Sequence, residues 1–98
     1  MSVYLIGNIR IEDRAEYQQY EAGFLEIFQR YAGKLLAVDE DQTVLEGQWP
    51  ATRTVVIEFP DEAAARAWYE SEAYQTLAKH RWASSQGDLA LVKGFGAG

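Results

Sequence analysis

The segment Val3–Ile11 constrains the fold of this chain more than any other part of its sequence. It is almost continuously apolar over the length of a strand, and both of its alternating sets of side chains contain large apolar residues. One set holds Val3, Leu5, Ile9 and Ile11, and the other holds Tyr4 and Ile6. Because successive side chains of a strand point to opposite faces, such a strand is usually covered on both faces. The chain therefore needs a cover for each side of its sheet.

A long amphipathic helix is predicted after this strand, from Asp13 to Ala32. Its aromatic and aliphatic side chains recur every three or four residues and share one face, whereas polar residues such as Glu21 take the remaining surface. Asp13 suits the N-cap position, with Glu16 as the return partner of a capping box. Gly33 stands where a left-handed residue would close the helix.

The other elements follow from apolar runs and from turn residues between them. We predict a strand over Lys34–Val38, a short extended piece over Thr43–Glu46, a strand over Arg53–Phe59, a helix over Glu62–Glu70, a helical stretch recapped at Ser71 that runs to about Trp82, a strand over Leu89–Lys93, and a flexible tail over residues 94–98.

Two βαβ-type halves in this order predict one α+β domain over residues 1–98, with a ferredoxin-like βαββαβ antiparallel sheet and two helices on one face. In that topology the first and third main strands, Val3–Ile11 and Arg53–Phe59, lie side by side at the centre. Two helices leave the other face bare, with side chains such as Val56 in water. Because monomers rarely expose large apolar patches, we predict a twofold homodimer whose sheets pack face to face as a dimeric α+β barrel.

Charge and composition disfavour several functional classes. The chain has 9 basic and 15 acidic residues, and its formal net charge of −6 disfavours nucleic acid and anionic membrane surfaces as partners. It has no cysteine, which excludes disulfides, thiolate catalysis and Cys-based zinc sites, and one histidine cannot form a His cluster within one subunit. We predict no metal site. The amino-terminal apolar stretch is short and follows no basic region, so we expect a soluble, cytoplasmic protein.

Glu58 is the most informative single candidate for chemistry. If Val55, Ile57 and Phe59 face the helices, Glu58 faces the barrel interior. A carboxylate there needs a partner or changes its proton affinity, which is how a general base is made. The alternative is a strand-end Glu58 that reaches solvent or pairs with an Arg across the sheet.

A second candidate cluster surrounds one loop and contains Glu46, Trp49 and Arg53. An Arg can clamp a carboxylate with two hydrogen bonds, and a Trp offers a flat apolar wall, so the cluster suits a small anionic or aromatic ligand. The alternative is a Glu46–Arg53 ion pair that holds the loop in place, with Trp49 covering the core.

The second half of the chain adds further candidates. Arg81 shares a predicted inner helix stripe with Tyr74 and suits an inward polar contact beside the catalytic candidates Arg53 and Glu58. The hydroxyls of Tyr20 and Tyr74 can serve as donors to a ligand between helix and sheet, and Trp68 belongs to the same aromatic interior. Core packing is the alternative for all three rings. His80 is interpreted as a solvated residue near a helix end.

Several ordered motifs together resemble a known family. They are Leu45-Glu46-Gly47-x-Trp49, Arg53-x-Val55-Val56-Ile57-Glu58-Phe59-Pro60, Ala67-Trp68-Tyr69-x-Ser71-x-x-Tyr74-Gln75, Arg81, and Leu91-Val92-x-Gly94. The set spans nearly the whole chain and resembles the uncharacterised domain of unknown function 1330. That family is similar to the dimeric α+β barrel superfamily, so the resemblance implies the fold and the pairing described above. The superfamily includes cofactor-independent monooxygenases, isomerases, haem-handling enzymes and ligand-binding domains, and fold alone does not choose among them.

The sequence contains no glycine-rich phosphate loop, no recognisable Ser-His-Asp spacing and no paired metal-binding carboxylate motif. We therefore predict a small-molecule-binding protein that, as an enzyme, would need no cofactor and would use acid–base chemistry on a small organic substrate. The alternatives are a non-catalytic ligand-binding module and a purely structural dimer. A pocket with a desolvated carboxylate beside an Arg favours the enzyme, and a pocket lined only by apolar side chains favours the binding module.

Overall fold

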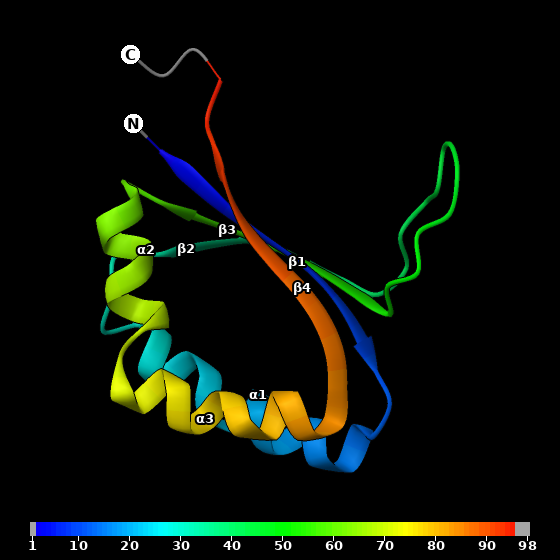
Figure 1. The fold of residues 1–98 in the computed structure, drawn as a ribbon, viewed down its shortest axis with the longest axis horizontal. Helices are drawn as coiled ribbons and strands as arrows, with labels where there is room; N and C mark the ends of the chain where they lie inside the picture. Colours follow the sequence, from blue (N-terminus) through cyan, green and yellow to red (C-terminus); the bar gives the residue numbers. More distant parts are fainter. Residues whose placement is uncertain (1, 96–98) are drawn as a thin grey trace.

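The computed structural model describes residues 2–95, and these form four strands and three helices. The elements are β1 (Val3–Ile11), α1 (Arg14–Phe28), β2 (Lys34–Asp39), β3 (Arg53–Phe59), α2 (Glu62–Tyr69), α3 (Glu72–Ser84) and β4 (Ser85–Lys93). The strands make one antiparallel sheet in the order β2-β3-β1-β4. All three helices lie on one side of it (Figure 1). The predicted α+β, ferredoxin-like architecture is confirmed, with the second helix divided into α2 and α3 at Ser71.

The two central strands are β1 and β3, as predicted. Their helix-facing side chains, among them Leu5, Ile9 and Ile57, are buried. On the opposite face, Ile6 pairs with Val56 across the two strands, and both stay half-buried. A single helix layer covers one face of a sheet only, so within one chain the second face of β1 has no cover.

Aromatic rings fill one end of the space between the helices and the sheet. Trp68 lies at the middle of this group, with its ring centroid 4.2 Å from that of Tyr74 and 5.7 Å from those of Phe28 and Phe59. Offset and edge-to-face arrangements of this kind stabilise a core beyond their buried area. The cluster joins α1, α2, α3 and β3 into one core.

The helix starts use side-chain caps. Asp13 accepts a hydrogen bond from the Glu16 backbone N–H at 3.2 Å, as predicted, and Ser71 accepts one from the Tyr74 N–H at 3.1 Å. The predicted return bond of the capping box is wrong. The Asp13 N–H already donates to the Ser84 carbonyl at 3.0 Å, so the Glu16 carboxylate instead reaches Nδ1 of His80 on α3 at 2.6 Å.

The end of α1 differs from the prediction. The helix stops at Phe28 rather than Ala32, and residues 29–31 continue in a tighter turn in which Tyr31 N–H donates to the Phe28 carbonyl. Gly33 does not take the left-handed conformation; within residues 2–95 a positive φ occurs at Gly47. Gly33 is required for a different reason, because a Cβ there would lie 2.6 Å from Phe28 Cζ and 2.7 Å from Phe59 Cε1.

Residues 40–52 form a loop that extends past the end of the sheet (Figure 1), and the predicted extended piece over Thr43–Glu46 is not a strand. No neighbouring strand is available to pair with it at that distance from the sheet.

The strand β4 begins earlier than predicted, because α3 passes directly into it at Ser85, which pairs with Ile11. The predicted flexible tail lies outside the described residues from position 96 onward. Within residues 2–95 there is no helix with both the length and the apolar character needed to span a membrane.

An ion-pair network ties α1 to the facing ends of β2 and β3. Arg53, the first residue of β3, contacts Glu21 of α1 at 2.7 Å and Glu40 at 2.5 Å. Arg14 at the start of α1 contacts the other oxygen of Glu40 at 2.5 Å. Hydrogen bonds from the Arg14 and Arg53 guanidiniums lower the pKa of Glu40 from 4.5 to about 2.

Replacing Gly33 by Ala tests the close contact between α1 and β3. We expect Gly33→Ala to lower the free energy of unfolding by roughly 1–3 kcal/mol, because the added methyl forces two buried rings apart. Chemical denaturation measures this change. Gly7→Ala is the matched control, since its Cβ would meet Leu89 Cγ at an ordinary 3.5 Å. Equal stability of Gly33→Ala and the parent protein would contradict the proposed packing role.

Replacing Glu40 by Gln tests the network through pH. The folded pKa of Glu40 lies below its ordinary value, so its contribution to stability is present above about pH 4.5 and is lost as the pH falls towards about 2. We expect Glu40→Gln to be less stable than the parent at pH 7, by about 1 kcal/mol or less because the pairs are partly exposed. Urea titrations at several pH values should show this difference vanishing near pH 2; a pH-independent difference would refute the linkage.

Candidate functional site

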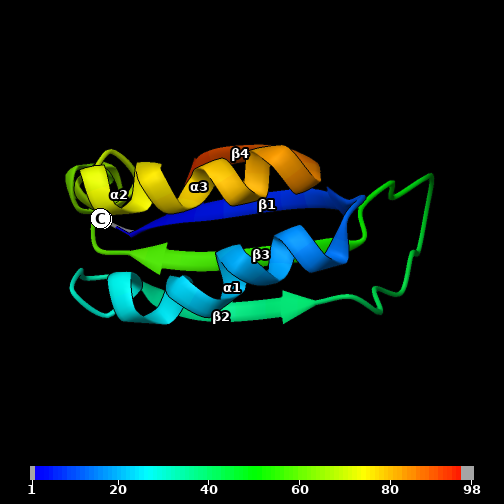
Figure 2. The same cartoon turned by 90° about the horizontal axis from the view of Figure 1, so that it is seen from below.

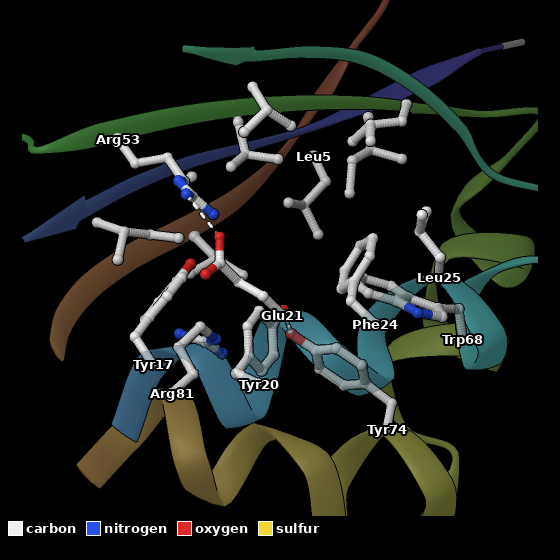
Figure 3. Close-up of a pocket in the computed structure, with 17 residues that line it drawn as sticks. Leu5, Tyr17, Tyr20, Glu21, Phe24, Leu25, Arg53, Trp68, Tyr74 and Arg81 are labelled. Carbon is white, nitrogen blue, oxygen red and sulfur yellow. Dashed lines mark hydrogen bonds and ion pairs between the residues drawn. The ribbon is translucent and has the colours of Figure 1, made fainter. Parts of the chain in front are cut away.

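A cavity of about 190 Å³ lies between the helix layer and the sheet (Figure 3). Its sheet side is apolar and includes Leu5, Ile9, Val55, Ile57 and Leu89. Gly7 stands at the middle of β1 and contributes no side chain, which leaves room between its neighbours. The cavity is therefore a gap in the core that the large aromatic side chains at one end do not fill.

The mouth of the cavity lies between α1 and the edge strand β2. Leu25, Leu35 and Val38 at the mouth are exposed, whereas lining residues further in, such as Leu5, Tyr20 and Ile57, are buried. Strand β2 is exposed along its whole length. Helices α1 and α3 run antiparallel to each other across the sheet, with α1 on the side of β2 and β3 (Figure 2).

The helix side of the cavity carries a polar group formed by Tyr20, Tyr74 and Arg81. The two tyrosine hydroxyls are 2.7 Å apart, which joins α1 to α3 by a hydrogen bond. The guanidinium carbon of Arg81 lies 5.8 Å from the Tyr20 ring centroid. Burial raises the pKa of the Tyr20 hydroxyl well above its usual range, so this group stays protonated at neutral pH. The three side chains present hydrogen-bond donors to the interior.

Arg81 is the most deeply buried charged residue among those described, with 3% of its surface exposed. It points inward because it continues the α3 stripe of Tyr74 and Ala78, which are also buried. Its own carbonyl accepts a hydrogen bond from the Ser85 hydroxyl at 2.5 Å, which fixes the backbone where α3 becomes β4.

Arg53 lines the cavity next to the start of β3, and its charge is compensated by Glu21 and Glu40. The guanidinium carbon lies 5.1 Å from the centroid of the Tyr17 ring, in a cation–π arrangement. Burial raises the pKa of the Tyr17 hydroxyl. This part of the wall is held by ion pairs, in contrast to the surroundings of Arg81.

The structure brings five of the predicted site residues together in this cavity, namely Tyr20, Arg53, Trp68, Tyr74 and Arg81. It also places Glu21 and Gly7 there, which the sequence analysis did not identify. Glu21 was assigned to the polar surface of α1, although its position four residues after Tyr17 puts it beside the inner stripe.

The other predicted site residues lie elsewhere. Glu58 is on the opposite face of the sheet, where the Tyr4 hydroxyl donates to its Oε2 at 3.5 Å. Trp49 is exposed and donates from Nε1 to Thr54 Oγ1 at 2.9 Å on that same face. Together with Glu46 it lines a second hollow of about 440 Å³ under the 40–52 loop.

The alternative ion pair between Glu46 and Arg53 is wrong, because Arg53 pairs with Glu21 and Glu40 on the helix side. His80 is partly exposed, as predicted, and takes Glu16 as its acidic partner. Within the part of the chain that the structure describes, no three His, Cys, Asp or Glu side chains are grouped so as to hold a metal ion.

Solved structures share this fold. A protein of unknown function from Rhodopseudomonas palustris is 19% identical, with a TM-score of 0.80 over 96% of this chain and 82% of that one. SnoaB, a cofactor-independent oxygenase from Streptomyces nogalater, is 15% identical, with a TM-score of 0.70 over 95% of this chain and 92% of that one. A dimeric ferredoxin-like protein of unknown function from Jannaschia sp. CCS1 is 11% identical, with a TM-score of 0.71 over 96% of this chain and 100% of that one. At these identities the likeness shows the fold alone.

No curated protein matches the chain. A sequence family described as a domain of unknown function (DUF1330) matches residues 2–95, which is nearly the whole chain. The match agrees with the topology and with the ordered motifs from the 40–52 loop to β4. The chain therefore belongs to the family of domain of unknown function 1330.

Proposed function

We propose that this protein binds a small, largely apolar organic molecule in the cavity between the helices and the sheet. The observation that carries the proposal is an apolar cavity of about 190 Å³ with a buried group of hydrogen-bond donors on one side. For comparison, an apolar protein cavity of about 150 Å³ accepts benzene. A ligand of one ring, or a short chain of similar volume, fits the space.

Acid–base catalysis without a cofactor is the second candidate function. It is supported by the paired hydroxyls of Tyr20 and Tyr74, which can pass a proton between them or donate one to a bound molecule. SnoaB, which shares the fold, is a cofactor-independent oxygenase. Arg53 and Arg81 line the same cavity, so their predicted catalytic roles remain proposals for this site. The role predicted for Glu58 concerns the other face of the sheet and remains a separate prediction.

The uncovered face of the sheet supports the proposal of a homodimer. The strand register places Ala37, Val56, Ile6 and Ala90 in one row across all four strands. This row is apolar throughout, and the exposed Val92 lies on the same face. The dimeric ferredoxin-like protein from Jannaschia has the same fold. Pairing two such faces would remove these side chains from water in an interface of standard size, about 800 Å² per subunit.

Filling the cavity tests the binding proposal. We expect one-ring organic compounds to raise the melting temperature of the parent protein, since a ligand of the folded state stabilises it by about 2.7 kcal/mol at a hundred times its Kd. Val55→Phe places a ring in the cavity and should abolish this shift. Val44→Phe, the same substitution on the 40–52 loop, is the matched control and should keep it. If no compound of a broad one-ring panel shifts the parent protein, the proposal fails.

The homodimer is tested by light scattering coupled to size-exclusion chromatography at micromolar concentration. We expect the parent protein to have twice the mass of one chain, and Val56→Glu to dissociate it, because the new carboxylate would be buried between two sheets. Leu25→Glu places the same charge on the helix side and should leave the dimer intact. A monomeric parent protein would overturn the proposal.

A further inference from the structure

We infer that the ligand of this cavity is an organic anion whose negatively charged oxygen group binds Arg81. The inference rests on the proposed function and specifies the class of ligand: a monoanionic acid, such as a carboxylate or an enolate, with an apolar body of about one ring. It follows from the charge balance around one side chain.

Arg81 lacks a counter-charge among the residues that the structure describes. Every other arginine in residues 2–95 has a carboxylate oxygen within 4.0 Å. These pairs are Arg10–Asp88, Arg14–Glu40, Arg30–Glu26, Arg53 with Glu21 and Glu40, and Arg66 with Glu62 and Glu70. The exposed arginines and the mostly buried Arg53 all have a carboxylate partner, whereas Arg81, the most deeply buried arginine, has none.

The surroundings of the guanidinium are neutral. Its Nε is fully buried without a hydrogen-bond partner. On the β4 side Nη1 is next to Gly87, which has no side chain; a Cβ added there would lie 3.5 Å from Nη1. The titratable groups that act on it are tyrosines, namely Tyr17, Tyr20, Tyr69 and Tyr74. The Tyr74 hydroxyl, which is hydrogen-bonded to Tyr20, is also a hydrogen-bond partner of the guanidinium, but it is a phenol and not a carboxylate counter-ion. Since burial raises the pKa of both Tyr17 and Tyr20, neither supplies a negative charge at neutral pH.

A buried charge without a partner is strongly unfavourable, so side chains of this kind are normally paired or hydrogen-bonded. Arg81 lines the cavity, and a ligand placed there would be its counter-ion. A carboxylate suits the guanidinium best, because two parallel N–H···O bonds can form. The Tyr20–Tyr74 pair has two hydroxyl protons and uses one between them, so the second can be donated to the same oxygen group.

The remaining walls limit what the anion can be. A single uncompensated arginine balances one negative charge, and the apolar sheet side offers nothing to a second one. A doubly charged phosphate is therefore disfavoured. The volume of about 190 Å³ also excludes nucleotides and other large phosphorylated molecules as fully enclosed ligands.

Matched pairs of acids and amides test the inference. Benzoate and benzamide have the same shape, as have hexanoate and hexanamide, and differ in charge. Isothermal titration calorimetry, supported by amide and indole NMR shifts, should show the parent protein binding an acid at least tenfold more tightly than its amide. Arg81→Met should lose this preference, while Arg30→Gln, which removes a surface arginine, should keep it.

The unliganded proteins give an independent readout. Because Arg81→Met removes an unpaired buried charge and keeps an apolar side chain of similar length, its melting temperature should rise above that of the unliganded parent. Arg81→Lys keeps the charge but loses the planar fork, so acid binding should weaken several-fold while a preference over the amide persists.

The outcomes separate the two proposals. Equal affinity for acids and amides in the parent protein, or an acid preference that survives in Arg81→Met, overturns the anionic ligand and leaves a neutral cavity ligand standing. A failure of acids and amides alike to bind, together with the lack of any thermal shift in the wider one-ring panel, overturns the proposed function as well. A melting temperature of Arg81→Met well below that of the parent would show that Arg81 has an internal partner, which also contradicts the inference.

Discussion

The structure depends on one constraint, which is a sheet with two apolar faces and a single layer of helices. The two faces of the sheet differ in how they are covered. The helix-facing side of β1 and β3 is buried under α1, α2 and α3 and contains the aromatic core. The other side keeps a row of small and β-branched residues, Ile6 and Val56 among them, that no part of the described chain covers. The division follows from the alternation of side chains along a strand, because each residue belongs to one face or the other.

The cavity follows from the same arrangement. Large rings, with Trp68 and Phe28 among them, hold the helices at a distance from the sheet at one end of the core. The central strands carry shorter side chains further along, and Gly7 carries none, so the space there is not filled. The residues that border it are of two kinds. Arg53 lies between two carboxylates, whereas the neighbours of the Arg81 guanidinium are tyrosines, so the two arginines of the cavity have different electrostatic surroundings.

Much of the fold could be predicted from local patterns. The bounds of β1 and β3 agree with the prediction because runs of β-branched and apolar residues define them, and the Asp13 and Ser71 caps use atoms three residues apart. The inward position of Arg81 followed from its helix stripe. Features that depend on contacts between distant segments could not be predicted: Arg53 meets Glu21 across 32 positions, His80 meets Glu16 across 64, and Gly33 is required by a ring from β3. The site was predicted only in part, because it too depends on contacts between distant segments. Helical spacing shows which residues point inward. It does not show which of the two sheet faces a loop residue such as Trp49 will contact.

The position of the cavity mouth beside β2 has a consequence for how a ligand of the proposed kind would reach the interior. Strand β2 is an edge strand, hydrogen-bonded to β3 alone, and its register shifts between Leu35 and Ala37. A displacement of this strand breaks hydrogen bonds on one side only and leaves the contact between β1 and β3 intact. The cavity mouth therefore lies beside an edge strand, and a ligand of the proposed kind would be able to enter by local opening of β2, without disruption of the central sheet.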